Sequence, residues 1–244
     1  MFYFDTIKDK KILKSSLLAE FEPDFCHLFT TKQSVIKSEE KNIKSVAKSN
    51  RKLILDTLAI NEDNLVEIKQ THGINIQIPR NTGFYDNTDG VALYKPNTAT
   101  ILHFADCTPV ILYDHKNKIA AGLHAGWRGT AGCISKLGVE LMKKHFNSKT
   151  SNIVAAIGPC IGQDDFECGQ EVYEALKNTA NKISDNCKVF KFTKDKVFCD
   201  LAKINAAQLK DAGIKNIDIC QFKTYKDNEF LFSYRRENKT TSRI

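Results

Sequence analysis

The segment Thr100-Ile-Leu-His-Phe-Ala-Asp-Cys-Thr-Pro-Val-Ile-Leu-Tyr113 carries the strongest structural signal in the chain. It is followed by the polar turn Asp114-His-Lys-Asn-Lys118 and by a second apolar run, Ile119-Ala-Ala-Gly-Leu-His124. Two strands with the apolar composition of a protein core, separated by a polar turn, predict a β-hairpin. A central strand tolerates proline badly, so we expect the first strand to be interrupted at Pro109, with a bend or bulge near Cys107.

Downstream of the hairpin, strands and helices alternate irregularly. Apolar residues at helical spacing predict a helix with Thr130 as its N-cap: Ile134, Leu137, Leu141, Met142 and Phe146. Later we expect a strand over 152–157, a helix carrying Val172, Tyr173 and Leu176, a helix over 201–210 between Asp200 and Gly213, and strands at 217–219 and 229–234. This mixture does not match a clean βαβ repeat. The sequence therefore predicts an α/β protein in which a mixed β-sheet core is flanked by helices.

Length and composition define the class of protein. The chain has 244 residues, 42% of them hydrophobic, and its 36 Lys and Arg against 29 Asp and Glu give a net charge of +7. Neither a linker nor an internal repeat is visible, so we expect one domain over residues 1–244 with a substantial core. No apolar run approaches the roughly 18–20 residues of a membrane span, and the start lacks the order of a signal peptide. We expect a soluble, cytoplasmic protein without a membrane partner.

The densest basic stretch runs from Lys32 to Lys52. Apolar residues recur there at near-helical spacing, which predicts an amphipathic helix with a solvated basic face. No interleaved aromatic residues or nucleic-acid-binding motif accompany the charge, so we expect no nucleic-acid partner. The strand after this helix, over 64–71, ends at His72 and Gly73.

Three segments place a potential metal ligand beside a glycine or a break in structure: Gln70-Thr-His72-Gly73, Ala105-Asp-Cys107 and His124-Ala-Gly-Trp-Arg-Gly129. The hairpin can bring Cys107 and His124 together. Zinc accepts imidazole and thiolate, and catalytic zinc sites commonly use three protein ligands. Asp89 and Asp106 could orient the histidines. On spacing alone this signal is weak, because lone His and Cys residues beside strands usually belong to the core.

The same residues allow two other readings. A set of two His and one Cys can hold copper, but a multicopper oxidase needs several more histidines, and this chain has six in all. We expect His103 to be a satisfied core residue, that is, a buried histidine whose ring nitrogens have hydrogen-bond partners. We expect His115 and His145 to face solvent. Alternatively, Cys107 could be a metal-free nucleophile with His124 or His72 as its base, and the sequence leaves this hydrolase open. We assign no function to Cys26, Cys133, Cys160, Cys168, Cys187, Cys199 and Cys220.

Several motifs in order along the chain resemble one family. They are the three segments above with Asp89-Gly90, Gly158-Pro-Cys-Ile-Gly162, Phe166-Glu-Cys-Gly169 and Phe232-Ser-Tyr-Arg-Arg236. Together they look like the YfiH-type family, long labelled multicopper polyphenol oxidase or laccase-domain proteins and now described as purine nucleoside phosphorylases. The match runs from about Cys26 to Arg243. It implies a YfiH-like fold with αββα-type layers.

The resemblance also implies an activity and a set of functional residues. Family members bind zinc through the residues that are His72, Cys107 and His124 here, and they cleave adenosine, inosine, guanosine and S-methyl-5'-thioadenosine with phosphate, with adenosine deamination besides. On this basis Cys107, His124 and Arg128 are catalytic candidates. Arg128 and Arg51 are candidates for substrate or anion contacts, and Arg51 could equally belong to a solvated helix face. The oligomeric state stays open, a homodimer included.

Two departures from the family pattern lie near the ends of the chain. Cys26-His-Leu-Phe-Thr-Thr-Lys32 matches the start of an amino-terminal element, but the glycines and the asparagine that follow it in the family are missing. Thr241-Ser242-Arg243 stands where Thr-Gly-Arg is usual. The first departure also shortens the segment, so the sequence leaves open whether one wall of the family's substrate pocket is kept; the second is a milder change.

Overall fold

The structure, a computed structural model, describes residues 1–183, 188–237 and 241–243. Its centre is a six-stranded sheet with the strand order β15-β11-β9-β10-β7-β5. These strands are β5 (Ile76–Gln77), β7 (Gly90–Leu93), β9 (Thr108–Asp114), β10 (Ile119–Ala125), β11 (Ile153–Ile157) and β15 (Asn216–Ile219). β9 and β10 form the predicted antiparallel hairpin, whereas β15 and β5 run parallel to their neighbours. The predicted mixed sheet is confirmed.

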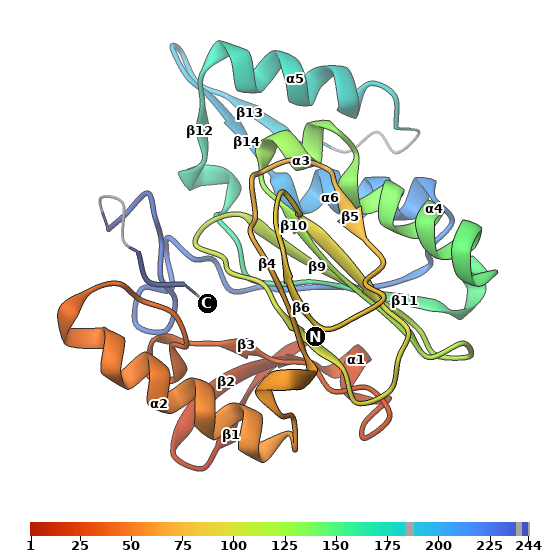
Figure 1. The fold of residues 1–244 in the computed structure, drawn as a ribbon. Helices are drawn as coiled ribbons and strands as arrows, with labels where there is room; N and C mark the ends of the chain where they lie inside the picture. Colours follow the sequence, from red (N-terminus) through yellow and green to blue (C-terminus); the bar gives the residue numbers. More distant parts are fainter. Residues whose placement is uncertain (184–187, 238–240, 244) are drawn as a thin grey trace.

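The main layers follow the order helix, sheet, sheet, helix (Figure 1). Helices α4 (Ile134–Phe146) and α6 (Leu201–Asp211) cover one face of the six-stranded sheet. Its other face packs on a second sheet of β1 (Phe2–Ile7), β2 (Lys10–Ser15) and β3 (Phe29–Thr30), with the short helix α1 (Ser16–Ala19). Helix α2 (Lys41–Thr57) lies on the outer side of that second sheet.

The alternation of side chains along β2 explains the two inner layers. Successive residues of a strand point to opposite faces of its sheet. Leu13 is fully buried with Phe2 and Phe29 against the six-stranded sheet, while Ile12 on the other face packs with Ile54 of α2. One short strand therefore contributes to two hydrophobic cores, and the amphipathic α2 predicted from the basic stretch covers the outer one.

Smaller elements complete the fold around this framework. One sheet contains β4 (Leu65–Ile68), β6 (Gly83–Tyr85) and β8 (Ala99–Ile101), and another contains β12 (Glu167–Cys168), β13 (Phe190–Phe192) and β14 (Val197–Cys199). The remaining α-helices described are α3 (Trp127–Ala131) and α5 (Gln170–Ala180), which contact each other. No helix in the described part of the chain has both the length and the apolar character to cross a bilayer.

The interruption predicted at Pro109 lies earlier in the chain. Pro109 is the second residue of β9, opposite His124, and its carbonyl accepts a hydrogen bond from the Gly158 amide at 2.9 Å. Proline has no amide hydrogen to donate to a neighbouring strand. It is tolerated here because β11 ends at Ile157, so no residue within β11 loses a hydrogen bond to Pro109. The irregular segment is 102–107, where Asp106 has a φ of +86°, which confirms the bend near Cys107.

Two other local predictions are wrong. Thr130 is not a helix cap: it lies inside α3, its hydroxyl accepts a hydrogen bond from Asn205 Nδ2 at 2.9 Å, and α4 begins after Cys133. The segment 229–234 is not a strand. Backbone groups of this segment form hydrogen bonds outside any sheet. The Leu231 amide donates to the Asp227 carbonyl, and the Leu231 carbonyl accepts from the Arg236 guanidinium. The predicted helix over 201–210 is confirmed, with the Asp200 carboxylate capping it.

Candidate metal centre

Two loops and the end of a strand bring the predicted ligands together. His72 lies in the turn after β4, Cys107 lies just before β9, and His124 is near the end of β10. One ligand atom from each residue lies within 4.8 Å of the others. His72 is exposed, Cys107 is half-buried and His124 is buried, so the group opens to solvent on the His72 side. We call these three residues the His–Cys–His cluster.

The carboxylate of Asp89 organises both histidines. Its Oδ1 accepts from His124 Nδ1 at 2.8 Å and from the His72 amide at 2.9 Å, and its Oδ2 accepts from the Gly73 amide at 2.7 Å. Because an ionised carboxylate can only accept, His124 carries a proton on Nδ1 and presents Nε2 to the cluster. Burial disfavours the charge of Asp89, but these hydrogen bonds outweigh burial and hold its pKa at about 2. The prediction that Asp89 orients a histidine is confirmed for the His124 ring, whereas at His72 the carboxylate fixes the backbone.

Asp106 has a different function from the one predicted. Its Oδ1 accepts from the Thr224 hydroxyl at 2.6 Å, and its Oδ2 accepts from the Arg235 amide at 2.7 Å. The positive φ of Asp106 turns the side chain toward the carboxyl-terminal segment. Asp106 therefore fixes the backbone that precedes Cys107, instead of orienting a histidine.

Gln70 connects the turn that carries His72 to the segment before Cys107. Its side chain donates to the His103 carbonyl and accepts from the His103 amide, both at 2.8 Å. His103 is not the satisfied core residue that we predicted, because its buried Nδ1 has no hydrogen-bond partner among the residues that the structure describes. Burial lowers the pKa of His103 to about 3, and the charges of Lys37, Arg51 and Arg243 act in the same direction.

Gly126 leaves the space in which the cluster fits. A Cβ at this position would lie 3.2 Å from Cys107 Sγ, 3.2 Å from His72 Cδ2 and 3.9 Å from His124 Cε1. A side chain here would crowd Cys107 and His72 by a few tenths of an ångström, so glycine suits the close approach of the backbone. Only the fold brings Gly126 to the other two ligand segments.

The electrostatic environment favours neutral ligands. Burial lowers the pKa of His72, and the nearby His124 and the positive charges of Arg128 and Arg243 also contribute to this shift. Burial, with a smaller contribution from the charge of Asp106, raises the pKa of the Cys107 thiol to about 12. A bound cation favours a thiolate and a neutral imidazole, so it would compensate for the burial of this thiol.

Arg128 follows His124 by four residues, and its predicted contact with a substrate or anion stays a prediction. It lies on α3, which starts directly after the strand that ends at Ala125. Its guanidinium stacks over the Trp127 ring at 4.1 Å, and its nearest carboxylate is that of Glu171, at 3.9 Å. The side chain is 58% exposed, so it can reach a ligand from solvent.

Arg51 lies on helix α2. Its guanidinium donates hydrogen bonds to the carboxylates of Glu62 at 2.7 Å and Glu67 at 2.9 Å. These two ion pairs raise the pKa of Arg51 and hold its side chain in place.

The sequence analysis assigned no function to Arg243, although its charge acts on both His72 and Cys107. The one signal for Arg243 was its place in a carboxyl-terminal motif of the resembling family.

The other cysteines and histidines stay outside the cluster. The seven cysteines that the structure describes are free thiols, among them the buried Cys160, Cys168, Cys199 and Cys220, and Cys187 lies outside the described residues. His145 is exposed as predicted, whereas His115 is half-buried and stacks on Phe21 with ring centroids 5.2 Å apart. His27 is buried, and its Nε2 accepts from the Ser15 amide.

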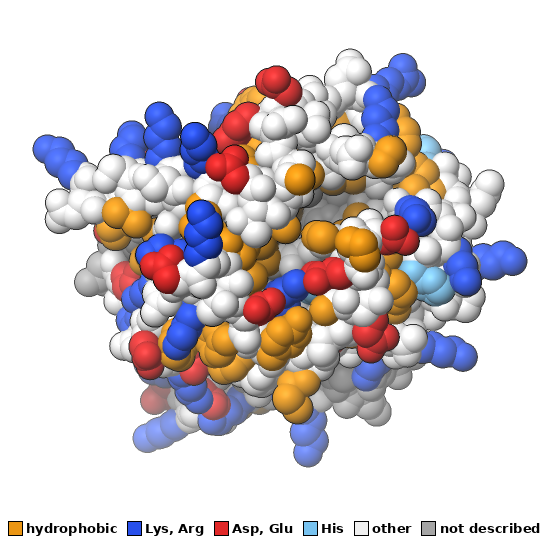
Figure 2. Space-filling view, turned by 90° about the horizontal axis from the view of Figure 1, so that it is seen from below, with side chains coloured by type: hydrophobic (Ala, Val, Ile, Leu, Met, Phe, Trp, Pro, Cys, Tyr) orange, Lys and Arg blue, Asp and Glu red, His pale blue; other side chains and the backbone are white. Residues whose placement is uncertain are grey.

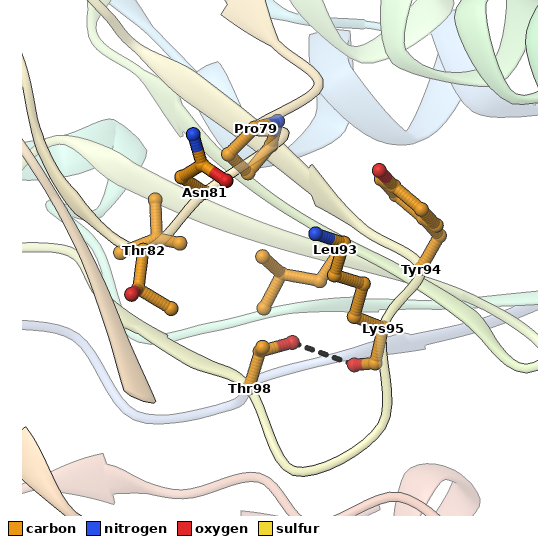
Figure 3. Close-up of a pocket in the computed structure, with 8 residues that line it drawn as sticks. Pro79, Asn81, Thr82, Leu93, Tyr94, Lys95 and Thr98 are labelled. Carbon is orange, nitrogen blue, oxygen red and sulfur yellow. Dashed lines mark hydrogen bonds between the residues drawn. The ribbon is translucent and has the colours of Figure 1, made fainter. Parts of the chain in front are cut away.

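Two cavities border this framework without reaching the ligands. The smaller one, about 190 Å³, is lined by Pro79, Asn81 and Tyr94 among others, and Figure 3 shows the Thr98 hydroxyl bonded to the Lys95 carbonyl at its edge. The larger one, about 760 Å³, lies between the two main sheets and includes Arg51 and Phe104 in its wall. Figure 2 shows hydrophobic side chains gathered over the middle of the face seen from below, with Lys and Arg around its margin.

Layered mixed sheets with a two-histidine, one-cysteine cluster at the end of a hairpin define an α/β protein with a candidate metal centre. Residues 35–244 match the family described as multi-copper polyphenol oxidoreductase laccase, and the chain belongs to that family.

Curated relatives carry the names of purine-metabolising enzymes. A purine nucleoside phosphorylase of Bacteroides thetaiotaomicron is 27% identical, over 97% of this chain and 95% of its own length. The purine nucleoside phosphorylase YfiH of Escherichia coli is 36% identical over 61% of this chain and 58% of its own. Adenosine deaminase RL5, from an unknown prokaryotic organism, is 33% identical over 73% of this chain and 72% of its own. Relatives of this kind support an enzyme of purine metabolism.

Solved structures confirm the fold. YlmD of Geobacillus stearothermophilus superposes with a TM-score of 0.86 and 25% identity, over 98% of this chain and 96% of that protein. The hypothetical protein YfiH of Bacillus licheniformis gives 0.80 and 27%, over 86% and 83%. The YfiH-like α/β fold and the family resemblance read from the sequence are both confirmed.

Proposed function

We propose that this protein is a zinc-dependent purine nucleoside phosphorylase with adenosine deaminase side activity. The observation that carries the proposal is the convergence of His72, Cys107 and His124 on one open site. The names of the relatives support the choice of purine nucleosides and phosphate as substrates. As substrates we propose adenosine, inosine, guanosine and S-methyl-5'-thioadenosine, which yield the free base and ribose 1-phosphate or its methylthio form.

The residues present fit a zinc ion. Two imidazoles and one thiolate are a donor set that zinc accepts, and a site with three protein ligands keeps one position open. The gap beside Gly126 and the fixed tautomer of His124 leave one ligand atom of each residue facing a shared space. Bound zinc would supply a Lewis acid and an acidic water, with a pKa near 7. Copper is the less favoured metal.

The chain's own residues would position and stabilise the reactants. Phosphorolysis breaks the bond between the purine nitrogen and the anomeric carbon and forms a bond from that carbon to a phosphate oxygen. Arg128 would bind the anionic reactant, because its planar donor fork matches phosphate oxygens. Asp89 would keep the His124 imidazole oriented while charge develops on the leaving base. Arg51, fixed by Glu62 and Glu67, is a more distant candidate for a substrate contact.

The metal-free cysteine hydrolase remains the main alternative, with Cys107 as nucleophile and His124 as base. The burial that raises the pKa of Cys107 to about 12 argues against it, because a protonated thiol is a poor nucleophile. A copper-binding polyphenol oxidase is the other alternative, after the description of the family. Metal analysis of the purified protein separates the three: we expect about one zinc per chain.

The proposal extends to the surroundings of the enzyme. Free thiols on the seven cysteines that are described support a reducing compartment, and we propose the cytoplasm. We propose no nucleic-acid or membrane partner, and a homodimer is the assembly to test by light scattering.

The test is phosphate-dependent release of base from a panel of nucleosides, run with and without a chelator. We expect ribose 1-phosphate in the presence of zinc and its loss on chelation. His124→Ala should abolish both phosphorolysis and deamination, with retained folding checked by circular dichroism. Absence of ribose 1-phosphate from every nucleoside tested would overturn the proposal, and full activity of the zinc-free protein would remove the metal from it.

A further inference from the structure

We propose that Arg243 and Lys37 form an anion subsite beside the His–Cys–His cluster that takes the phosphate co-substrate. The inference rests on the proposed phosphorolysis and assigns its second reactant to a particular wall of the site. Neither Arg243 nor Lys37 was a candidate in the sequence. What places them there is a contact between the two ends of the chain.

The backbone holds Arg243 and Lys37 side by side. The two residues form an isolated antiparallel β-bridge, in which the Arg243 amide donates to the Lys37 carbonyl at 3.1 Å. The adjacent Ser242 is fully buried, and its hydroxyl bonds the Ser38 hydroxyl at 2.9 Å and the Glu40 carboxylate at 3.0 Å. The carboxyl-terminal segment is therefore anchored to residues 37–40.

Packing connects this bridge to the cluster. Val35, two residues before Lys37, belongs to a small hydrophobic core with the buried Phe104. Cys107, one of the candidate ligands, packs against this core. The Phe104 ring also lies 5.5 Å from the His124 ring, between centroids. Asn50 of α2 donates to the Val35 carbonyl at 3.0 Å, which ties the helix that carries Arg51 to the same segment. Lys37 and Arg243 are thus carried on backbone that packs, through Val35 and Phe104, against the surroundings of the candidate metal ligands.

Electrostatic interactions show how far these charges reach. After burial, the charges of Lys37, Arg51 and Arg243 are the causes that lower the pKa of His103, whose backbone is clamped to the turn of His72. These charges therefore act on the residue that joins the turn of His72 to the segment before Cys107.

Several acidic groups among the described residues have donors of their own. Glu62 and Glu67 hold Arg51, Glu40 accepts from Ser242, Asp89 binds His124, and Asp106 binds Thr224. The buried His103 Nδ1 has no partner in the described part of the chain, and a phosphate oxygen would accept a hydrogen bond from it when that nitrogen carries the proton. Arginine and lysine together suit a tetrahedral dianion, since the guanidinium donates two parallel hydrogen bonds and the ammonium adds a point charge.

Arg243→Gln and Lys37→Met test the subsite, with Arg80→Gln, an exposed arginine between β5 and β6, as the matched control. Losing a charged hydrogen bond to phosphate should raise the KM for phosphate by about 10- to 100-fold in Arg243→Gln and by less in Lys37→Met. The KM for the nucleoside should change far less. Arg243→Lys should recover part of the phosphate affinity, and the control should match the wild type.

A binding measurement keeps the inference separate from the proposed reaction. Inorganic phosphate should raise the thermal midpoint of the wild-type protein and of Arg80→Gln, and this shift should be smaller in both subsite variants. If the wild type releases no ribose 1-phosphate but the shift still depends on Arg243, the proposed function fails and the anion subsite stands. An unchanged phosphate KM and an unchanged thermal shift in both Arg243→Gln and Lys37→Met would overturn the subsite.

Discussion

The carboxylate of Asp89 accepts a hydrogen bond from His124 Nδ1 at 2.8 Å, across 35 positions of sequence, and both side chains are buried. The same carboxylate accepts from the backbone amides of Thr71, His72 and Gly73. One side chain therefore sets the tautomer of one candidate ligand and the backbone position of another. The cluster depends on this connection as much as on its three ligands.

Asp89→Asn should weaken metal binding by about 10- to 100-fold, because an amide cannot accept from the histidine and the three amides with the strength of a carboxylate. Competition with a chromophoric chelator measures the affinity. Asp86→Asn is the control, since Asp86 lies in the same turn and its side chain is 64% exposed. Equal zinc affinities for the two variants would contradict the organising function of Asp89.

Gly126→Ala should disturb the cluster, because the added methyl group would lie 3.2 Å from both Cys107 Sγ and His72 Cδ2. Gly169→Ala is a matched control. Both glycines are helix N-caps with similar extended backbone angles, and a Cβ at Gly169 would meet nothing within 4 Å. Each variant should lose up to about 1 kcal/mol of stability from the cap, but only Gly126→Ala should lose zinc. Full zinc occupancy in Gly126→Ala would show that the ligands move aside.

His27 should make the fold sensitive to acid. Burial lowers its pKa to about 4, below the ordinary value of 6.5, and the charge of Lys14 adds to the effect. The unfolded state therefore binds the proton more readily, so the stability from neutral His27 is complete above pH 6.5 and is lost as the pH falls toward 4. The loss should approach roughly 3 kcal/mol. Urea unfolding at several pH values measures it.

His27→Asn removes the titrating group and keeps an acceptor for the Ser15 amide, which bonds His27 Nε2 at 2.9 Å. We expect this variant to be less stable at neutral pH but to lose less stability between pH 6.5 and 4. His145→Asn, at an exposed position, should keep the wild-type pH dependence. If the unfolding free energies of His27→Asn and of the wild type fall in parallel as the pH is lowered, another group causes the acid sensitivity.

Asn205 should be important for the position of α3. Its side chain is fully buried, donates to the Thr130 hydroxyl at 2.9 Å and accepts from the Ser135 hydroxyl at 2.6 Å, so it joins α6 to α3 and α4. Asn205→Leu leaves both hydroxyls without this partner and should cost about 2–3 kcal/mol of unfolding free energy, measured by urea denaturation. Lys203→Leu on the same helix is the exposed control. A difference below about 0.5 kcal/mol between them would refute this.

The sequence by itself determined the hairpin, the mixed α/β class and the three candidate ligands. Local physics suffices for the hairpin, because two apolar runs around Asp114–Lys118 can pair only by turning back. The ligands were recognisable because each sits in a distinctive motif, and the family confirmed by residues 35–244 carries those motifs. Asp89 was also within reach of the sequence, as a polar residue in a turn-rich segment.

Only the tertiary structure decided what surrounds the ligands. Thr130 and the segment 229–234 were misjudged because their hydrogen bonds go to Asn205 and Arg236 and not to local partners. Gly126 acquires its function from Cys107 and His72, which approach it from other loops. Arg243 meets Lys37 through a bridge that joins opposite ends of the chain. Such contacts depend on how whole layers pack, and no periodicity in the sequence records which distant residues that packing brings together.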